Sequence, residues 1–217
     1  MSKIFILVEG PTEKFFIEQI LMPWFDSYQI FMIPTILTTK RAADGTPYKG
    51  GNDYSKIKKD LNSLLKDPSS IAVTTMFDLF GLPNNFPGKT DCPHSNHYNH
   101  IMCLEEAFSY DISNPKFIPY LQLHEFEAFL FADIATFADS FSKIRHLHSK
   151  LQAIRVQFQS PEEINDVNPP SRRIEELIPN YQKAVDGLNV IKKIGLDELR
   201  HQCLHFSEWC DKLQSIS

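Results

Sequence analysis

The chain has 217 residues, 42% of them apolar, which suits one domain or one domain with an appendage and excludes a disordered chain. The formal net charge of −5 argues against a protein that coats nucleic acid by bulk positive charge. It leaves open an enzyme whose acidic side chains hold a metal ion.

The amino-terminal stretch is not expected to be a signal peptide, because its apolar run (IFILV) is short and acids follow it without a cleavage site. No later apolar run approaches the roughly 18 residues that cross a bilayer, so we expect no membrane association. The cysteines are few and widely spaced, which predicts reduced thiols in a cytoplasmic protein: Cys92, Cys103, Cys203 and Cys210.

Predicted strands and helices alternate over roughly the first 130 residues. Apolar and β-branched runs predict strands at residues 3–8, 29–38, 70–77 and 116–123. Apolar residues at helical spacing predict helices at residues 12–25, 53–66 and 99–108, and polar sequence predicts loops at residues 39–52 and 81–96. Pro34 marks the second strand as an edge or bulged strand. The alternation predicts an α/β fold with a mostly parallel sheet flanked by helices on both faces.

The remainder of the chain has helical spacing, with helices predicted at residues 140–158, 171–178, 181–190 and 196–213. The main loop within it is SPEEINDVNPPSRR. We therefore divide the chain into an α/β domain at residues 1–133 and a helical carboxyl-terminal extension at residues 134–217, packed on that domain.

Acidic side chains follow three of the four predicted strands. Glu9 follows the first strand, with Glu13 one helical turn later, Asp78 follows the third, and Glu125 and Glu127 follow the fourth. The carboxyl ends of parallel strands meet at one edge of a sheet, so these acids should converge. Crowded carboxylates repel one another unless a cation lies between them, and oxygen-only ligands suit Mg²⁺ or Mn²⁺. The alternative is that single acids cap helices or face solvent.

Several motifs together resemble one fold family. ILVEGPTE, with Glu9 and Gly10 after the first strand, and MFDLFG, with Asp78 after a later strand, are similar to the metal-binding motifs of the TOPRIM fold. The segments HEFEAFLF, PSRRIEELIPNYQK and HFSEW resemble small stand-alone OLD-like TOPRIM proteins, often encoded beside an AAA-type ATPase. The resemblance covers nearly the whole chain and implies a Rossmann-like TOPRIM sheet that binds Mg²⁺ or Mn²⁺.

The sequence departs from the TOPRIM pattern at Phe80, where the family has a second aspartate. Glu125 and Glu127 are the candidates to replace that ligand. If the chain is still extended there, both side chains point to one side; if a helix has begun, they diverge and at most one contributes. We expect Glu125, nearest the strand end, to be the stronger candidate, while Glu127 is either a ligand or a helix-surface acid.

The resemblance to OLD-type nucleases implies Mg²⁺-dependent hydrolysis of a phosphodiester, in DNA or in RNA such as tRNA. It implies that Glu9 is a metal ligand or general acid–base and that Asp78 is a direct ligand. Glu13 and Glu125 would be direct or water-mediated ligands.

A cation is also expected beside the scissile phosphate. The candidates are Arg173 and Lys183, whereas neighbouring Arg172 is favoured as ordinary surface charge. His124 adjoins the acids and could hydrogen-bond one of them, although a structural histidine is the favoured interpretation.

The expected partners are nucleic acid and an AAA-type ATPase, in an anti-phage or toxin-like system, with homo-oligomerisation left open. An alternative is a catalytically reduced TOPRIM subunit that binds or regulates its ATPase, as Phe80 would signal. A primase-like polymerase ranks last because no nucleotide-binding module is visible; PGKT lacks the first glycine of a P-loop.

A zinc site is a further alternative. One loop carries Cys92, His94, His97 and His100. These residue types bind zinc, but their spacing is not that of a standard finger and no second cysteine pair brackets them.

Overall fold

The computed structural model describes residues 2–37, 53–94, 96–164 and 167–216. The loop predicted at residues 39–52 therefore lies wholly outside the described residues. None of the helices within the described ranges is long and apolar enough to cross a membrane.

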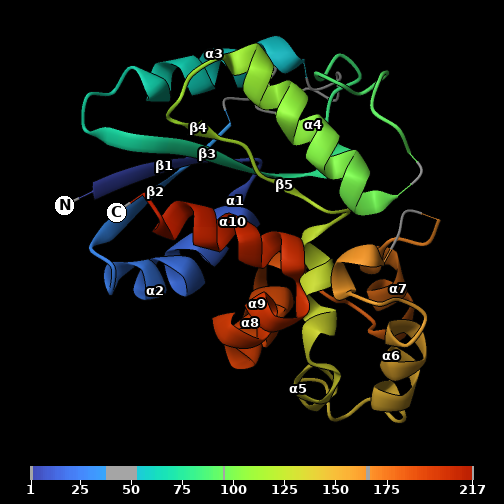
Figure 1. The fold of residues 1–217 in the computed structure, drawn as a ribbon. Helices are drawn as coiled ribbons and strands as arrows, with labels where there is room; N and C mark the ends of the chain where they lie inside the picture. The colour runs from blue at the N-terminus through green and yellow to red at the C-terminus, as the bar shows by residue number, and fades with distance from the viewer. Residues whose placement is uncertain (1, 38–52, 95, 165–166, 217) are drawn as a thin grey trace, which may run out of the picture.

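A parallel sheet forms the centre of the fold, as predicted (Figure 1). Within the described residues its order is β2-β1-β3-β4, and β5 pairs with the carboxyl end of β3. The strands are β1 (Ser2–Val8), β2 (Ile30–Ile36), β3 (Ser70–Asp78), β4 (Phe117–Ile118) and β5 (Leu121–Gln122). β2 lies at the edge of this order, which agrees with the prediction made from Pro34, a residue that cannot donate a ladder hydrogen bond.

The fourth predicted strand is interrupted, so the prediction of one continuous strand at residues 116–123 is wrong. A side chain explains the break: the Thr75 hydroxyl donates to the Tyr120 carbonyl oxygen (2.8 Å) and accepts from the Tyr120 N–H (3.1 Å). At Tyr120, between β4 and β5, these two side-chain bonds take the place of backbone pairing with β3.

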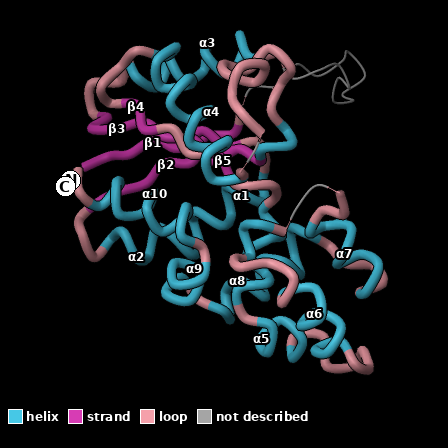
Figure 2. The backbone as a smooth tube through the Cα atoms, turned by 45° about the vertical axis from the view of Figure 1, so that its right-hand side comes forward, coloured by secondary structure: helices cyan, strands magenta, loops and turns pink. Residues whose placement is uncertain are grey.

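Helices cover both faces of the sheet (Figures 1 and 2). On one face lie α3 (Tyr54–Leu65) and α4 (His97–Ile112). The other face carries α1 (Pro11–Phe16), the π-helical segment Ile17–Leu21, α2 (Met22–Asp26) and α10 (Leu204–Gln214).

The carboxyl-terminal part is helical, as predicted, but its first helix is not continuous. The prediction of a helix at residues 140–158 is wrong in its first part: residues 140–146 form turns, in which His146 adopts a left-handed backbone (φ 59°), and the helix α6 spans Leu147–Arg155. The elements of this part are α5 (Ile134–Asp139), α6 (Leu147–Arg155), α7 (Pro170–Leu177), the π-helical η5 (Lys183–Gly187), α8 (Leu188–Ile194) and α9 (Leu196–Gln202).

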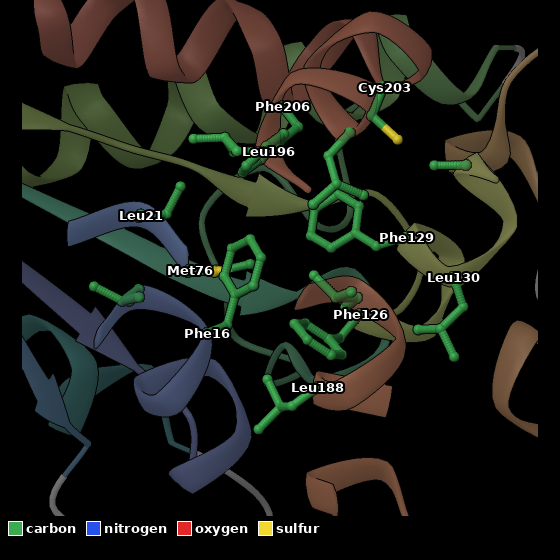
Figure 3. Close-up of a cluster of buried hydrophobic side chains, with 14 of the residues drawn as sticks. Phe16, Leu21, Met76, Phe126, Phe129, Leu130, Leu188, Leu196, Cys203 and Phe206 are labelled. Carbon is green, nitrogen blue, oxygen red and sulfur yellow. The ribbon is translucent and has the colours of Figure 1, made fainter. Parts of the chain in front are cut away.

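The helical part shares one hydrophobic core with the sheet. Figure 3 shows Phe16 of α1, Phe129 of the 3₁₀ segment η3 (Phe126–Ala132) and Phe206 of α10 in one buried cluster. The Phe206 ring lies 4.8 Å from that of Phe129 and 5.9 Å from that of Phe16. Trp209, also on α10, donates its indole N–H to the Thr74 hydroxyl of β3. α10 is therefore an integral layer of the α/β fold.

The prediction of four reduced thiols is wrong for two of the cysteines. Cys92 and Cys103 form a disulfide, with their Cα atoms 5.8 Å apart, because the loop after β3 folds back onto α4. Cys203 and Cys210 are free and buried.

Replacing Phe206 by alanine should lower the free energy of unfolding by about 3–5 kcal/mol, since the side chain is fully buried among aromatic rings. Leu204→Ala, on the same helix but 61% exposed, should change it by less than about 0.5 kcal/mol. Urea unfolding measures both. Equal effects of the two substitutions would show that α10 is not part of the core.

Candidate metal centre

Acidic side chains from separate elements meet at the carboxyl edge of the sheet. Glu9 directly follows β1, Glu13 lies in the first turn of α1 and Asp78 is the last residue of β3. Glu127 joins them from η3. The strand-end placement predicted from the sequence therefore brings these carboxylates into one neighbourhood, hereafter the carboxylate cluster (Glu9, Glu13, Asp78 and Glu127).

The ammonium group of Lys183 lies among the cluster. Its Nζ atom is 3.5 Å from Glu13 Oε1, 3.5 Å from Asp78 Oδ2 and 3.3 Å from Glu127 Oε2. The side chains of Glu13 and Glu127 are only 8% and 4% exposed, so their charges are poorly solvated. One ammonium faces several carboxylates, which leaves negative charge in excess.

The pKa values of the acids reflect this crowding. Burial, followed by repulsion from Asp78 and Glu13, raises the pKa of Glu9 to about 8. Burial raises the pKa of Asp78 to about 7, although Lys183 opposes the shift. Burial likewise raises the pKa of Glu127. Attraction to the acids outweighs burial at Lys183 and raises its pKa, so the ammonium keeps its charge.

Gly81 gives the Glu9 carboxylate its space. A Cβ atom at position 81 would lie 2.7 Å from Glu9 Oε1 and 2.8 Å from Glu9 Oε2. Gly10 has a smaller role than its place in the motif suggests, because its φ of −156° is open to any residue. Sequence reasoning missed Gly81; its proximity to Asp78 in MFDLFG is the signal that could have found it.

Glu125 and Glu127 have different partners, because a 3₁₀ helix begins at Phe126, although Glu125 is near enough to repel Asp78 and Glu127. Glu127 faces Lys183, whereas Glu125 accepts a hydrogen bond from the Ser171 backbone N–H of α7 (3.0 Å). The turn depends on His124, whose left-handed backbone (φ 66°) redirects the chain between β5 and η3. The structure therefore places Glu127, rather than the favoured Glu125, beside Lys183.

The arginine candidates lie in other contacts. Arg173 donates its Nε–H to the Asn168 carbonyl oxygen and packs over the Phe158 ring at 5.5 Å. Arg172 pairs with Glu176 on an exposed helix face. Of the basic residues proposed from the sequence, Lys183 is the one whose described contacts reach the carboxylate cluster.

The zinc alternative loses its cysteine, since Cys92 is bonded to Cys103. The histidines of that loop make ring contacts: His94 with His100 (centroids 4.2 Å apart), and His97 with His124 (4.7 Å). The Phe80 ring stacks on the His124 ring, with centroids 5.4 Å apart. Phe80 thus supplies an aromatic surface where the TOPRIM pattern has a ligand.

The donor chemistry of the carboxylate cluster fits a hard divalent cation. All the donors are carboxylate oxygens, and the missing side chain at Gly81 leaves room for the Glu9 carboxylate among them. In the part of the chain that the structure describes, no group of three or more His, Cys, Asp or Glu side chains is already arranged to hold a metal ion. Three of the acids, Glu13, Asp78 and Glu127, instead lie around the Lys183 ammonium group. A Mg²⁺ ion would be held by carboxylates of this cluster, in the place that the Lys183 ammonium takes among Glu13, Asp78 and Glu127.

One family model matches this chain, over residues 8–214: a domain of unknown function, DUF4276. The chain therefore belongs to that family, whose description assigns no activity. No curated protein and no solved structure matches the chain.

The stability of the metal-free protein should fall by about 1–3 kcal/mol as the pH rises from about 5 to 8. Folding raises the pKa of Glu9 from 4.5 to about 8. Below pH 4.5 this shift does not lower the free energy of unfolding; the loss grows as the pH rises and levels off above about pH 8. Glu9→Gln should flatten this slope, and exposed Glu208→Gln should keep it. Denaturant unfolding in the presence of a chelator measures the slope; a wild-type slope in Glu9→Gln would contradict the assignment.

Lys183→Met should lower the free energy of unfolding by about 3 kcal/mol, because it leaves buried carboxylates without their cation. Lys14→Met removes an exposed pair with Glu18 and should cost less than about 0.5 kcal/mol. Thermal unfolding at neutral pH compares the two variants. Equal costs would mean that Lys183 does not compensate the cluster.

Proposed function

We propose that this member of the DUF4276 family is a Mg²⁺-dependent nuclease that hydrolyses phosphodiesters in DNA or in RNA such as tRNA. One observation carries the proposal: a lysine ammonium held by Glu13, Asp78 and Glu127 at the carboxyl edge of a parallel sheet. This edge is where open α/β sheets bind ligands.

The cluster suits a cation better than it suits a structural ion pair. A structural pair would match the charges, whereas here one ammonium contacts three carboxylates, those of Glu13, Asp78 and Glu127. Burial raises the pKa of Asp78 to about 7 even with the ammonium beside it. Such an excess of buried negative charge is relieved when a divalent ion binds. The expected resident ion is Mg²⁺, or Mn²⁺ in its place.

The side chains have distinct roles in this proposal. Asp78 and Glu127 would hold the ion, with Glu13 as a direct or water-mediated ligand. Bound Mg²⁺ would neutralise charge on the phosphate. Burial and the neighbouring acids raise the pKa of Glu9 to about 8 in the metal-free protein. With the ion bound, Glu9 would be a metal ligand or the general acid–base. Lys183, once released from the acids, can pair with a phosphate oxygen, and Glu125 orders α7 beside the site through Ser171.

The resemblance to OLD-like TOPRIM proteins supports the rest of the proposal. It favours an AAA-type ATPase as partner, an effector role in anti-phage defence or a toxin-like system, and a cytoplasmic location. The proposal leaves open whether the protein forms a homo-oligomer. In a reducing compartment such as the cytoplasm, the Cys92–Cys103 disulfide would be reduced to two thiols.

A second candidate function rests on Phe80. An aromatic ring stacked on His124 cannot ligate a metal, so position 80 lacks the carboxylate that the TOPRIM pattern has there. A catalytically reduced subunit that binds its partner ATPase fits this loss. Co-purification with the ATPase, together with absence of cleavage under either metal, would favour this candidate.

Purified protein should cut plasmid DNA or total tRNA in the presence of Mg²⁺ or Mn²⁺, and a chelator should abolish the cutting. Asp78→Asn and Glu9→Gln should each lower the cleavage rate by about 100-fold or more, because they remove a ligand and a proton carrier. Gel assays of both substrates measure the rates.

Glu208→Gln, an exposed acid on α10, is the matched control and should cut as the wild type does. Cleavage that survives in Asp78→Asn, or that resists the chelator, would contradict the assigned site.

A further inference from the structure

A cavity of about 530 Å³ is lined in part by residues that neighbour the carboxylate cluster in the chain, beginning with Leu79 directly after Asp78. It is lined by Leu79, Phe80, Leu82, Lys89, His94, His97, His100, Leu104 and His124. Its walls combine aromatic rings with nitrogen donors. Such a lining matches a planar, polar ligand better than a purely apolar one.

The cavity and the carboxylate cluster share two backbone segments. Phe80 comes two residues after Asp78, a span of at most about 7 Å, and His124 directly precedes Glu125. A ligand anchored at the cluster by a phosphate would therefore reach the cavity with a group attached close to that phosphate.

The aromatic wall is exposed and rigidly backed. Phe80 is 43% exposed, although most phenylalanines of this chain are buried. One side of its ring stacks on His124, with an interplanar angle of 22°, and His124 in turn meets the edge of His97. The backing fixes the Phe80 ring and leaves part of its surface available for stacking.

The polar lining is arranged for contacts other than metal binding. Nδ1 of His100 lies 3.0 Å from the Pro93 carbonyl oxygen, and its ring lies beside that of His94. Lys89 donates to the carbonyl oxygen of Leu82, so this hydrogen bond joins two residues of the cavity wall. Imidazole and ammonium nitrogens in these positions can donate to the edge of a nucleobase or to a phosphate.

We propose that this cavity receives an unpaired base of the strand being cleaved, stacked on Phe80, while the adjoining phosphate lies at the carboxylate cluster. This inference rests on the proposed nuclease function and narrows its substrate to a single-stranded or looped segment. Bases inside a duplex are stacked on one another, so their faces are not available to an aromatic side chain.

The test is fluorescence anisotropy with a short labelled single strand and with the duplex made from it, in Ca²⁺ buffer. The single strand should bind about tenfold or more tightly than the duplex, and Phe80→Ala should weaken single-strand binding by about 5- to 100-fold. Phe80→Trp keeps a stacking surface and should stay within about threefold of the wild type. Phe31→Ala is the control, because Phe31 is 37% exposed at the opposite, amino-terminal end of the sheet.

Single-strand binding by Phe80→Ala equal to that of the wild type, or an equal loss in Phe31→Ala, would overturn the base-binding cavity and leave the nuclease proposal standing. Equal binding of single strand and duplex would also overturn it. If the wild type binds neither nucleic acid and cuts none in Mg²⁺, the nuclease proposal itself fails.

Discussion

The contact of one lysine ammonium with three carboxylates is the interaction on which the rest of this structure depends. Lys183 lies more than 100 residues from Asp78 in the chain, yet its Nζ atom is within 3.5 Å of acids from α1, β3 and η3. Without this cation, parallel strands would deliver like charges to one buried edge. The helical carboxyl-terminal part is therefore needed electrostatically as well as for its packing against the sheet.

The sequence predicted the elements of the sheet and the convergence of the acids because both follow from local patterns. A strand that ends on Glu9 or Asp78 places its acid at the sheet edge whatever the distant helices do. The identity of the cation could not be derived in this way. Arg172, Arg173 and Lys183 all lie on helical segments, and only long-range packing decides which of them meets the acids.

The choice between Glu125 and Glu127 shows a different limit. It depended on whether a helix had begun, and the left-handed backbone of His124 decides that point. Few non-glycine residues adopt such a conformation, so no sequence rule would have placed it there. The broken fourth strand is similar, since the Thr75 hydroxyl takes over the hydrogen bonds of Tyr120. Both features arise from contacts between distant parts of the chain.

The central claim is that the carboxylate cluster holds a divalent cation in exchange for Lys183. Anomalous diffraction from crystals soaked in Mn²⁺ tests it most directly. The account predicts a manganese peak bounded by Asp78 and Glu127, with the Lys183 ammonium moved away from the Glu13, Asp78 and Glu127 carboxylates that it contacts in the metal-free protein. Crystals with no peak there, and with Lys183 still among the acids at saturating Mn²⁺, would contradict it.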